Sequence, residues 1–223
     1  MTAKIELGVL DSVDGSAQWQ TGSTKVLCSV TGPVAAKPRD ERPDVATVEL
    51  VCRPVTGLSN VRSTAIQDRV FRALSSVMLR HLHPRMLVQI VVQVVEPGEP
   101  LEYNCRELAA AINSAVSALI DASFPLQGVA TAVSVAVMED GEYIFDPDYD
   151  TLSSGLVKST HAVAYEVRGG VAERLLLCES TGTFTEDQLF ACIEKSVAEC
   201  EKVYKDLQSA TGDKIRQDFI WND

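Results

Sequence analysis

The sequence predicts an α+β fold in one domain over residues 1–223, with two related halves that each contain strands followed by a long helix. Strand-like and helix-like segments occur in the order strands, helix, strand, helix, strands, helix. The chain has 223 residues, of which 46% are hydrophobic, and this is enough to fill a sizeable core. The central helix is rich in Ala and Ser, and such small side chains suit close packing on a sheet.

The first half opens with three expected strands, at residues 5–10, 25–30 and 45–53. In these segments apolar and polar residues alternate, or the residues are apolar in succession. Turn signals separate them at residues 14–16 (Asp-Gly-Ser) and 31–33 (Thr-Gly-Pro). We therefore expect them to lie in a sheet.

An amphipathic helix is expected from Arg62 to Arg80, ending before Pro84. A strand-length apolar run follows at residues 86–95, and Pro97-Gly98 then breaks the chain. The inward face of the helix is marked by apolar residues at spacings of three and four, namely Ile66, Val70, Ala73, Leu74, Val77 and Met78.

The small-residue helix opens at Cys105-Arg106 and ends near Pro125. Further strands are expected at residues 129–138, 143–145, 159–167 and 171–178, the last two joined by a hairpin at Arg168-Gly169-Gly170. A capping box, Thr185-Glu186-Asp187-Gln188, opens the last helix. Its inward positions are Leu189, Cys192, Ile193, Val197, Cys200, Val203 and Leu207.

The net charge of −11 argues against a protein that binds nucleic acid by its own phosphate neutralisation, so any RNA contact has to be local or shared with partner chains. No apolar run is long enough to span a membrane, and no targeting segment is visible, which places the chain inside the cell. The six cysteines are scattered singly, without zinc-like spacing, and are expected to be buried free thiols: Cys28, Cys52, Cys105, Cys178, Cys192 and Cys200.

Two arginines stand at expected helix starts. Arg106 lies in the first turn of the central helix, where free N–H groups and the helix dipole favour an anion, and Arg62 opens the helix before it. Together they could converge on one phosphate. The alternative is a salt bridge to Glu107 or to another acid at the edge of the core, and the residues alone leave both possibilities open.

Other candidate sites fail on their spacing. Asp146, Asp148 and Asp150 resemble the start of a calcium loop, but Thr151 and Val157 stand where that loop needs Gly and Glu. His81 and His83 lie at a helix end with no third metal ligand near in sequence, and His161 lies in a strand without a nucleophile elbow. No metal and no cofactor is expected.

Five short motifs in collinear order resemble the RNase PH family, at residues 14–17, 22–26, 62–74, 105–112 and 181–185. The resemblance implies the family's fold, which is of the ribosomal protein S5 domain 2-like type. Within the family, the compact N-terminus is most similar to the RNase PH-like ring subunits of the eukaryotic RNA exosome. The resemblance also implies that Arg62 and Arg106 match the arginines that hold phosphate in the active enzymes, whereas Cys105 replaces a threonine of that site.

The active enzymes carry their catalytic aspartate at the end of an Asp-Leu-x-Tyr-x-Glu-Asp pattern. This chain reads Asp146-Pro147-Asp148-Tyr149-Asp150-Thr151-Leu152, so Asp146 and Tyr149 match and Leu152 takes the catalytic position. A leucine neither donates a proton nor binds magnesium. If this segment were extended, Asp150 would share the face of Leu152, displaced by about 6 to 7 Å. Cys105, Asp146 and Leu152 are therefore interpreted as degenerate active-site positions, with no catalytic residue.

The resemblance implies a non-catalytic ring subunit that supports RNA 3′-end processing and degradation, including processing of ribosomal RNA, with RNA contact in the channel at Arg62 and Arg106. Its implied partners are other RNase PH-like subunits in a six-membered ring, cap subunits with RNA-binding domains, a catalytic exoribonuclease subunit and threaded RNA, without a membrane. The implied location is the nucleus, including the nucleolus, and the cytoplasm. The alternative is an active 3′-to-5′ exoribonuclease, phosphorolytic or magnesium-dependent.

Overall fold

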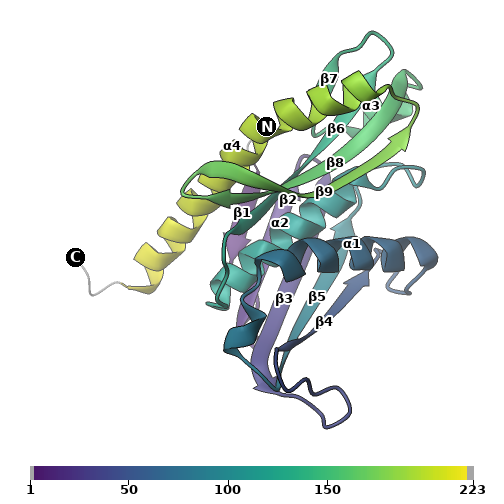
Figure 1. Ribbon diagram of the computed structural model, residues 1–223. Helices are drawn as coiled ribbons and strands as arrows, with labels where there is room; N and C mark the ends of the chain where they lie inside the picture. Colours follow the sequence, from purple (N-terminus) through teal and green to yellow (C-terminus); the bar gives the residue numbers. More distant parts are fainter. Residues whose placement is uncertain (1–2, 220–223) are drawn as a thin grey trace.

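The computed structural model describes residues 3–219 and contains two sheets (Figure 1). The larger sheet has the strand order β1-β2-β3-β5-β4. Its strands are β1 (Lys4–Leu7), β2 (Gly15–Thr21), β3 (Thr24–Ala35), β4 (Thr47–Arg53) and β5 (Met86–Glu96). Neighbouring strands are antiparallel except β4 and β5, which are parallel. A parallel pair needs a crossover connection, and helix α1 (Val61–Val77) supplies most of it, followed by the short helix η1 (Arg80–Leu82).

The smaller sheet is antiparallel throughout, with the order β7-β6-β8-β9. Its strands are β6 (Val129–Met138), β7 (Tyr143–Phe145), β8 (Val157–Arg168) and β9 (Val171–Gly182). A single turn, α3 (Tyr149–Ser153), lies between β7 and β8, and the long helix α4 (Glu186–Asp218) follows β9. Figure 1 shows α4, in yellow, crossing the smaller sheet and continuing beyond it.

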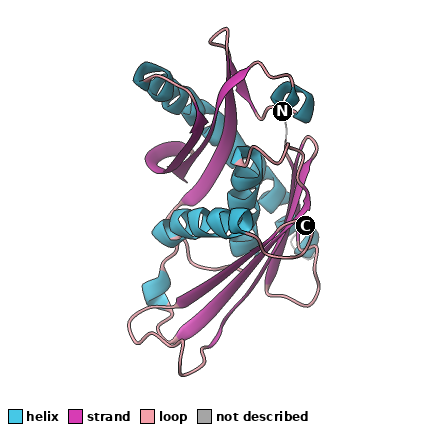
Figure 2. Cartoon of the chain, turned by 90° about the vertical axis from the view of Figure 1, so that its right-hand side faces the viewer, coloured by secondary structure: helices cyan, strands magenta, loops and turns pink. Residues whose placement is uncertain are grey.

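Helix α2 (Cys105–Asp121) packs against strands of both sheets. Figure 2 shows the two groups of strands at opposite ends of the molecule with helices between them. Every residue of α2 from Cys105 to Leu119 is buried, which its Ala and Ser side chains permit because they let both sheets approach closely. The main hydrophobic core therefore combines residues of both sheets around α2.

The expected order of strands and long helices is confirmed, but β2, α3 and η1 were not predicted. The helix expected to reach Arg80 ends at Val77, and η1 follows it as a separate short helix. Residues 14–16 were interpreted as a turn, whereas Gly15 and Ser16 begin strand β2. A Cβ atom at Gly15 would lie 2.3 Å from the backbone nitrogen of Ala122, so this glycine allows β2 to pass the end of α2 rather than making a turn. The turn α3 was also missed, because one turn of helix leaves no periodic pattern.

Candidate functional site at the start of helix α2

The N-terminus of α2 binds a carboxyl group, which belongs to Glu99 of the same chain. Glu99 lies in the loop before the helix and is 5% exposed. One of its carboxylate oxygens accepts the backbone N–H of Arg106 at 3.2 Å, and the other accepts the backbone N–H of Glu107 at 3.0 Å. The N-cap residue Asn104 makes no capping bond with its side chain. Glu99 therefore satisfies first-turn donors that a cap residue usually satisfies.

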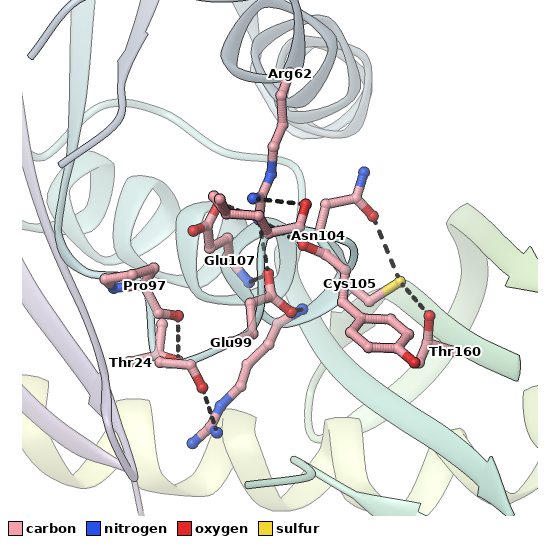
Figure 3. Close-up of polar contacts among 12 residues, drawn as sticks. Thr24, Arg62, Pro97, Glu99, Asn104, Cys105, Glu107 and Thr160 are labelled. Carbon is pink, nitrogen blue, oxygen red and sulfur yellow. Dashed lines mark hydrogen bonds and ion pairs between the residues drawn. The ribbon is translucent and has the colours of Figure 1, made fainter. Parts of the chain in front are cut away.

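Arg62 reaches the same point from the first turn of α1 (Figure 3). Its guanidinium lies 3.0 Å from a carboxylate oxygen of Glu107 and 3.5 Å from one of Glu99. It also donates to the carbonyl oxygens of Leu101, at 3.2 Å, and Tyr103, at 2.5 Å. Arg62 thus forms the salt bridge to Glu107 that the sequence left open as an alternative, and its RNA contact stays a prediction.

Arg106 is also in the first turn of α2, but its guanidinium binds backbone carbonyls. It donates to Thr21 at 2.7 Å, Pro147 at 2.9 Å and Gly98 at 3.4 Å, and the whole residue is 2% exposed. Asp148 lies 3.6 Å from it. Arg106 therefore joins the end of β2 to two loops, one from each half of the chain, and RNA contact at this residue likewise stays a prediction.

Gly22 makes room for this arrangement. It has a φ of +53°, and a Cβ atom there would lie 2.3 Å from a guanidinium nitrogen of Arg106. The neighbouring Thr24 hydroxyl donates to the carbonyl oxygen of Pro97 at 2.9 Å. The turn between β2 and β3 is thereby fixed against the loop that carries Glu99.

The two glutamates titrate abnormally. Burial raises the pKa of Glu99 to about 7, and the nearby carboxylate of Glu107 contributes to this rise. Burial also raises the pKa of Glu107, while the charge of Arg62 opposes that shift. The guanidinium of Arg62 thus lies within ion-pair distance of the buried carboxyl groups of both Glu99 and Glu107.

Cys105 and Asp146 each make contacts that fit a structural role. The Cys105 thiol donates to the hydroxyl of Thr160 at 3.5 Å, and burial raises the pKa of this thiol to about 12, so it stays protonated at neutral pH. Asp146 has a φ of +48°, and its carboxylate accepts the Ser134 hydroxyl at 3.0 Å. Burial raises the pKa of Asp146 as well.

Leu152 and Asp150 lie on different sides of α3. Leu152 is 3% exposed, whereas Asp150 is exposed. The idea that Asp150 shares the face of Leu152 assumed an extended segment, and it is wrong because residues 149–153 form a helical turn. Residues two apart in a helix differ in direction by about 200°. Asp150 therefore does not share the face of Leu152.

The cysteines are free thiols, as expected, and His161 lies between two hydroxyl groups. All six cysteines are free, and five are buried, with Cys178 partly exposed. His161 is buried between the hydroxyls of Ser159, at 2.9 Å, and Ser180, at 2.8 Å, and burial lowers its pKa. Among residues 3–219, no three His, Cys, Asp or Glu side chains gather as a metal site would require.

Glu99 is the site residue that the sequence did not reveal. Its position offered one signal, an acid in a Pro-Gly-Glu-Pro loop a few residues before an expected helix start. Which helix amides it would meet depends on how the loop folds, and no local pattern gives that.

The chain and its fold match one family. The RNase PH model, described as the 3′ exoribonuclease family, domain 1, matches residues 2–125. The chain belongs to the RNase PH family, as the five motifs predicted. Within that family it is similar to the exosome complex component RRP46 of Saccharomyces cerevisiae, with 36% identity over 96% of this chain and 97% of the relative. It is also similar to the exosome complex component rrp46 of Schizosaccharomyces pombe, with 32% identity over 91% of this chain and 86% of the relative.

Solved structures agree with the fold. Rice (Oryza sativa) Rrp46 matches with a TM-score of 0.82 and 28% identity, covering 92% of each chain. A chain of the Archaeoglobus fulgidus exosome with RNA bound to the active site matches with a TM-score of 0.73 and 16% identity, covering 91% of this chain and 87% of the other. At that identity the match shows the fold alone, and it confirms the predicted fold class.

Proposed function

We propose that this chain is a non-catalytic RNase PH-like subunit of an exosome ring, and that it supports RNA 3′-end processing and degradation, including the processing of ribosomal RNA. The observation that carries the proposal is Leu152, which stands at the position of the family's catalytic aspartate and is 3% exposed. A buried leucine offers neither a proton nor a metal ligand, and Asp150 faces away from it.

The proposed assembly is a six-membered ring of RNase PH-like subunits with cap subunits that carry RNA-binding domains and with a separate catalytic exoribonuclease. Its first support is the similarity to proteins named exosome complex components. Its second support is the open edges of the sheets: within residues 3–219, β1, β4, β7 and β9 each have one side without a paired strand. Open strand edges are natural sites for pairing with another chain.

RNA contact at Arg62 and Arg106 is part of this proposal. The side chain of Arg62 is 23% exposed, so RNA could reach it directly, whereas that of Arg106 is 2% exposed. In the assembled ring, Arg62→Ala is expected to weaken crosslinking to RNA, because it removes a charge that can bond to phosphate. Undiminished crosslinking of an intact ring would assign Arg62 to its salt bridge alone.

The second candidate function is an active 3′-to-5′ exoribonuclease, phosphorolytic or magnesium-dependent, that uses Asp146, Asp148 or Asp150 with the two arginines. One observation favours it. A rice relative, 31% identical over 87% of this chain and 84% of its own length, is named an exosome complex exonuclease RRP46 homolog.

An RNA degradation assay distinguishes the two candidate functions. Loss of a proton donor typically lowers a rate by a factor of ~10² to 10⁴, so we expect no measurable shortening of a 3′-labelled single-stranded RNA. The chain alone and its assembly are each incubated with phosphate or with Mg²⁺, and Asp146→Ala and Asp150→Ala serve as controls. Release of nucleoside diphosphate or monophosphate that disappears in Asp150→Ala would establish the enzyme and refute the non-catalytic proposal.

We further infer one domain over residues 1–223, since α2 contributes to a core shared by both sheets. Limited proteolysis that separated two stable halves would contradict this. The proposed role also places the protein in the nucleus, including the nucleolus, and in the cytoplasm, which imaging of the tagged chain would test.

A further inference from the structure

A basic surface lies at the end of the larger sheet where β3 ends and β5 begins (Figure 1). It combines residues 36–46, the loop between β3 and β4, with residues 80–85, which lie between α1 and β5. These two segments carry five Lys or Arg and three Asp or Glu residues, a net charge of +2 in a chain whose net charge is −11. The five basic residues are Lys37, Arg39, Arg42, Arg80 and Arg85.

Backbone hydrogen bonds hold the two segments of the basic surface together. The N–H of Arg85 donates to the carbonyl oxygen of Arg42 at 3.0 Å. The N–H of Ala46 donates to the carbonyl oxygen of Arg80 at 2.9 Å, and the Nε atom of Arg80 donates to the carbonyl oxygen of Ala46 at 3.0 Å. The fold itself therefore sets the backbone positions from which the basic side chains extend.

Most of the positive charge on this surface is not neutralised. Arg39 pairs with Asp40 and Arg85 with Glu41, each at 3.4 Å. Within the described chain, three basic residues of the surface have no ion pair with a carboxylate: Lys37, Arg42 and Arg80.

Arg42 and Arg80 also repel each other. Burial and the charge of Arg42 lower the pKa of Arg80, while the charge of Asp44 opposes this shift. An external anion between the two guanidinium groups would relieve this repulsion.

Arg85 has a backbone conformation that suits other residues better. Its φ is +62°, in the left-handed region that glycine and asparagine adopt more readily than arginine. The side chain is 70% exposed, so its burial does not compensate for the strain. Strained positions of this kind gather at ligand-binding sites.

The basic surface is separate from the candidate site at α2. Arg85 directly precedes β5, whereas Glu99 lies three residues after the end of this strand. Because β5 has 11 residues that each add about 3.3 Å, the two sites are roughly 35 Å apart.

We propose that the basic surface binds the phosphate backbone of single-stranded RNA. The choice of RNA as the polyanion rests on the proposed function, but no residue of the site at α2 takes part. Guanidinium and ammonium groups form charge-assisted hydrogen bonds with phosphate oxygens. Such contacts carry little sequence preference, and they are the local kind of RNA contact that the net charge of −11 still permits.

The test measures the binding of a fluorescein-labelled oligouridylate to the full-length chain by fluorescence anisotropy at several salt concentrations. The main variant combines three changes at exposed positions, Lys37→Ala, Arg42→Ala and Arg85→Asn. Each lost phosphate contact should weaken binding about fivefold at about 0.1 M salt and reduce the salt slope by about 0.7. This variant should therefore bind RNA about 100-fold more weakly than the natural chain, with a salt slope smaller by about 2.

The matched control combines Lys202→Ala, Lys205→Ala and Arg216→Asn, which remove the same charge from exposed positions of α4. Its affinity for RNA should change by less than about twofold, because salt screens distant charges.

Arg85→Asn alone separates binding from folding. Asparagine tolerates a positive φ, so the thermal midpoint should stay the same or rise while RNA binding weakens about fivefold. Unchanged RNA binding in this variant would contradict the contact at Arg85.

Equal weakening in the main variant and in the matched control would show that only net charge matters, and it would overturn the proposal. Tighter binding of a labelled polyglutamate with as many charges as the RNA would also overturn it, and would assign the surface to an acidic protein. An absence of RNA binding by the natural chain would refute this inference alone, because the proposed function needs RNA contact only in the ring. The proposed function is tested separately, by the RNA degradation assay.

Discussion

The two ends of helix α2 are each held by a buried carboxylate, but the carboxylates meet opposite ends of the helix dipole. At the N-terminus, Glu99 accepts two backbone N–H groups of the helix. At the C-terminus, Asp121 accepts the backbone N–H of Ser16 at 2.8 Å and forms an ion pair with Lys214 of α4. A negative charge is favourable at the first end and unfavourable at the second.

The difference explains which partners each carboxylate has. Asp121 needs a dedicated cation, and Lys214 provides it from the last helix of the chain. Glu99 has helix amides, so its nearby cation, Arg62, is free to pair at closer range with Glu107. The carboxylate at the N-terminal end thus depends mainly on two backbone donors of the helix, and the one at the C-terminal end on an ion pair and one backbone donor. Substitutions should therefore affect the two ends differently.

The largest expected effect is at the N-terminal end. Arg106→Ala should lower the free energy of unfolding by about 3–5 kcal/mol, because it leaves the carbonyls of Thr21, Pro147 and Gly98 without their charged donor. Denaturant titration measures this loss. A loss below about 1 kcal/mol would mean that water replaces the guanidinium, and that this end is less dependent on Arg106 than its contacts indicate.

The pH dependence should also come from the N-terminal end. Burial raises the pKa of Glu99 from 4.5 to about 7, so the folded chain holds this proton more tightly than the unfolded chain does. The contribution to stability is complete below pH 4.5 and is lost as the pH rises through 7. Relative to Glu99→Gln, the natural chain should lose roughly 2–3 kcal/mol of unfolding free energy between pH 4.5 and 8. Parallel pH profiles of the two proteins would contradict the shift.

The smallest expected effect is at the C-terminal end. Lys214→Met keeps much of the side-chain volume but removes the charge opposite Asp121, whose side chain is 5% exposed. The free energy of unfolding should fall by about 1–2 kcal/mol, since Lys214 itself is 28% exposed and water can partly replace it. Lys205→Met, on the same helix, is the matched control. Equal stabilities of the two variants would show that the ion pair adds nothing to the anchoring of α2.

The sequence predicted elements better where a long periodic pattern existed. The three long helices were expected close to their observed positions because each combines apolar spacing with a terminal signal. Strand β2 was missed because Gly15-Ser16 resembles a turn, although Ala17, Trp19 and Thr21 alternate inward.

The candidate site was predictable in part for the same reason. Arg62 and Arg106 were correctly placed at two helix starts, because a helix start has a local signature. The partner Glu99 was not found, because its carboxylate meets the helix through a loop whose path depends on tertiary packing. An extended segment would place Asp150 on the same face as Leu152, but residues 149–153 form a helical turn, and the two side chains therefore point in different directions.

The ion pair between Lys214 and Asp121 also bears on how the chain folds during synthesis. Helix α4 follows all the other described elements in the sequence, and it packs beside β1, which precedes them. The side chain of Lys214 also lies against Gly8, just after β1. The strand β1 and the end of α2 therefore gain these contacts only after the chain has been synthesised as far as Lys214. A nascent chain that ends before α4 should expose this surface to chaperones, and the fold should close only once α4 has been synthesised.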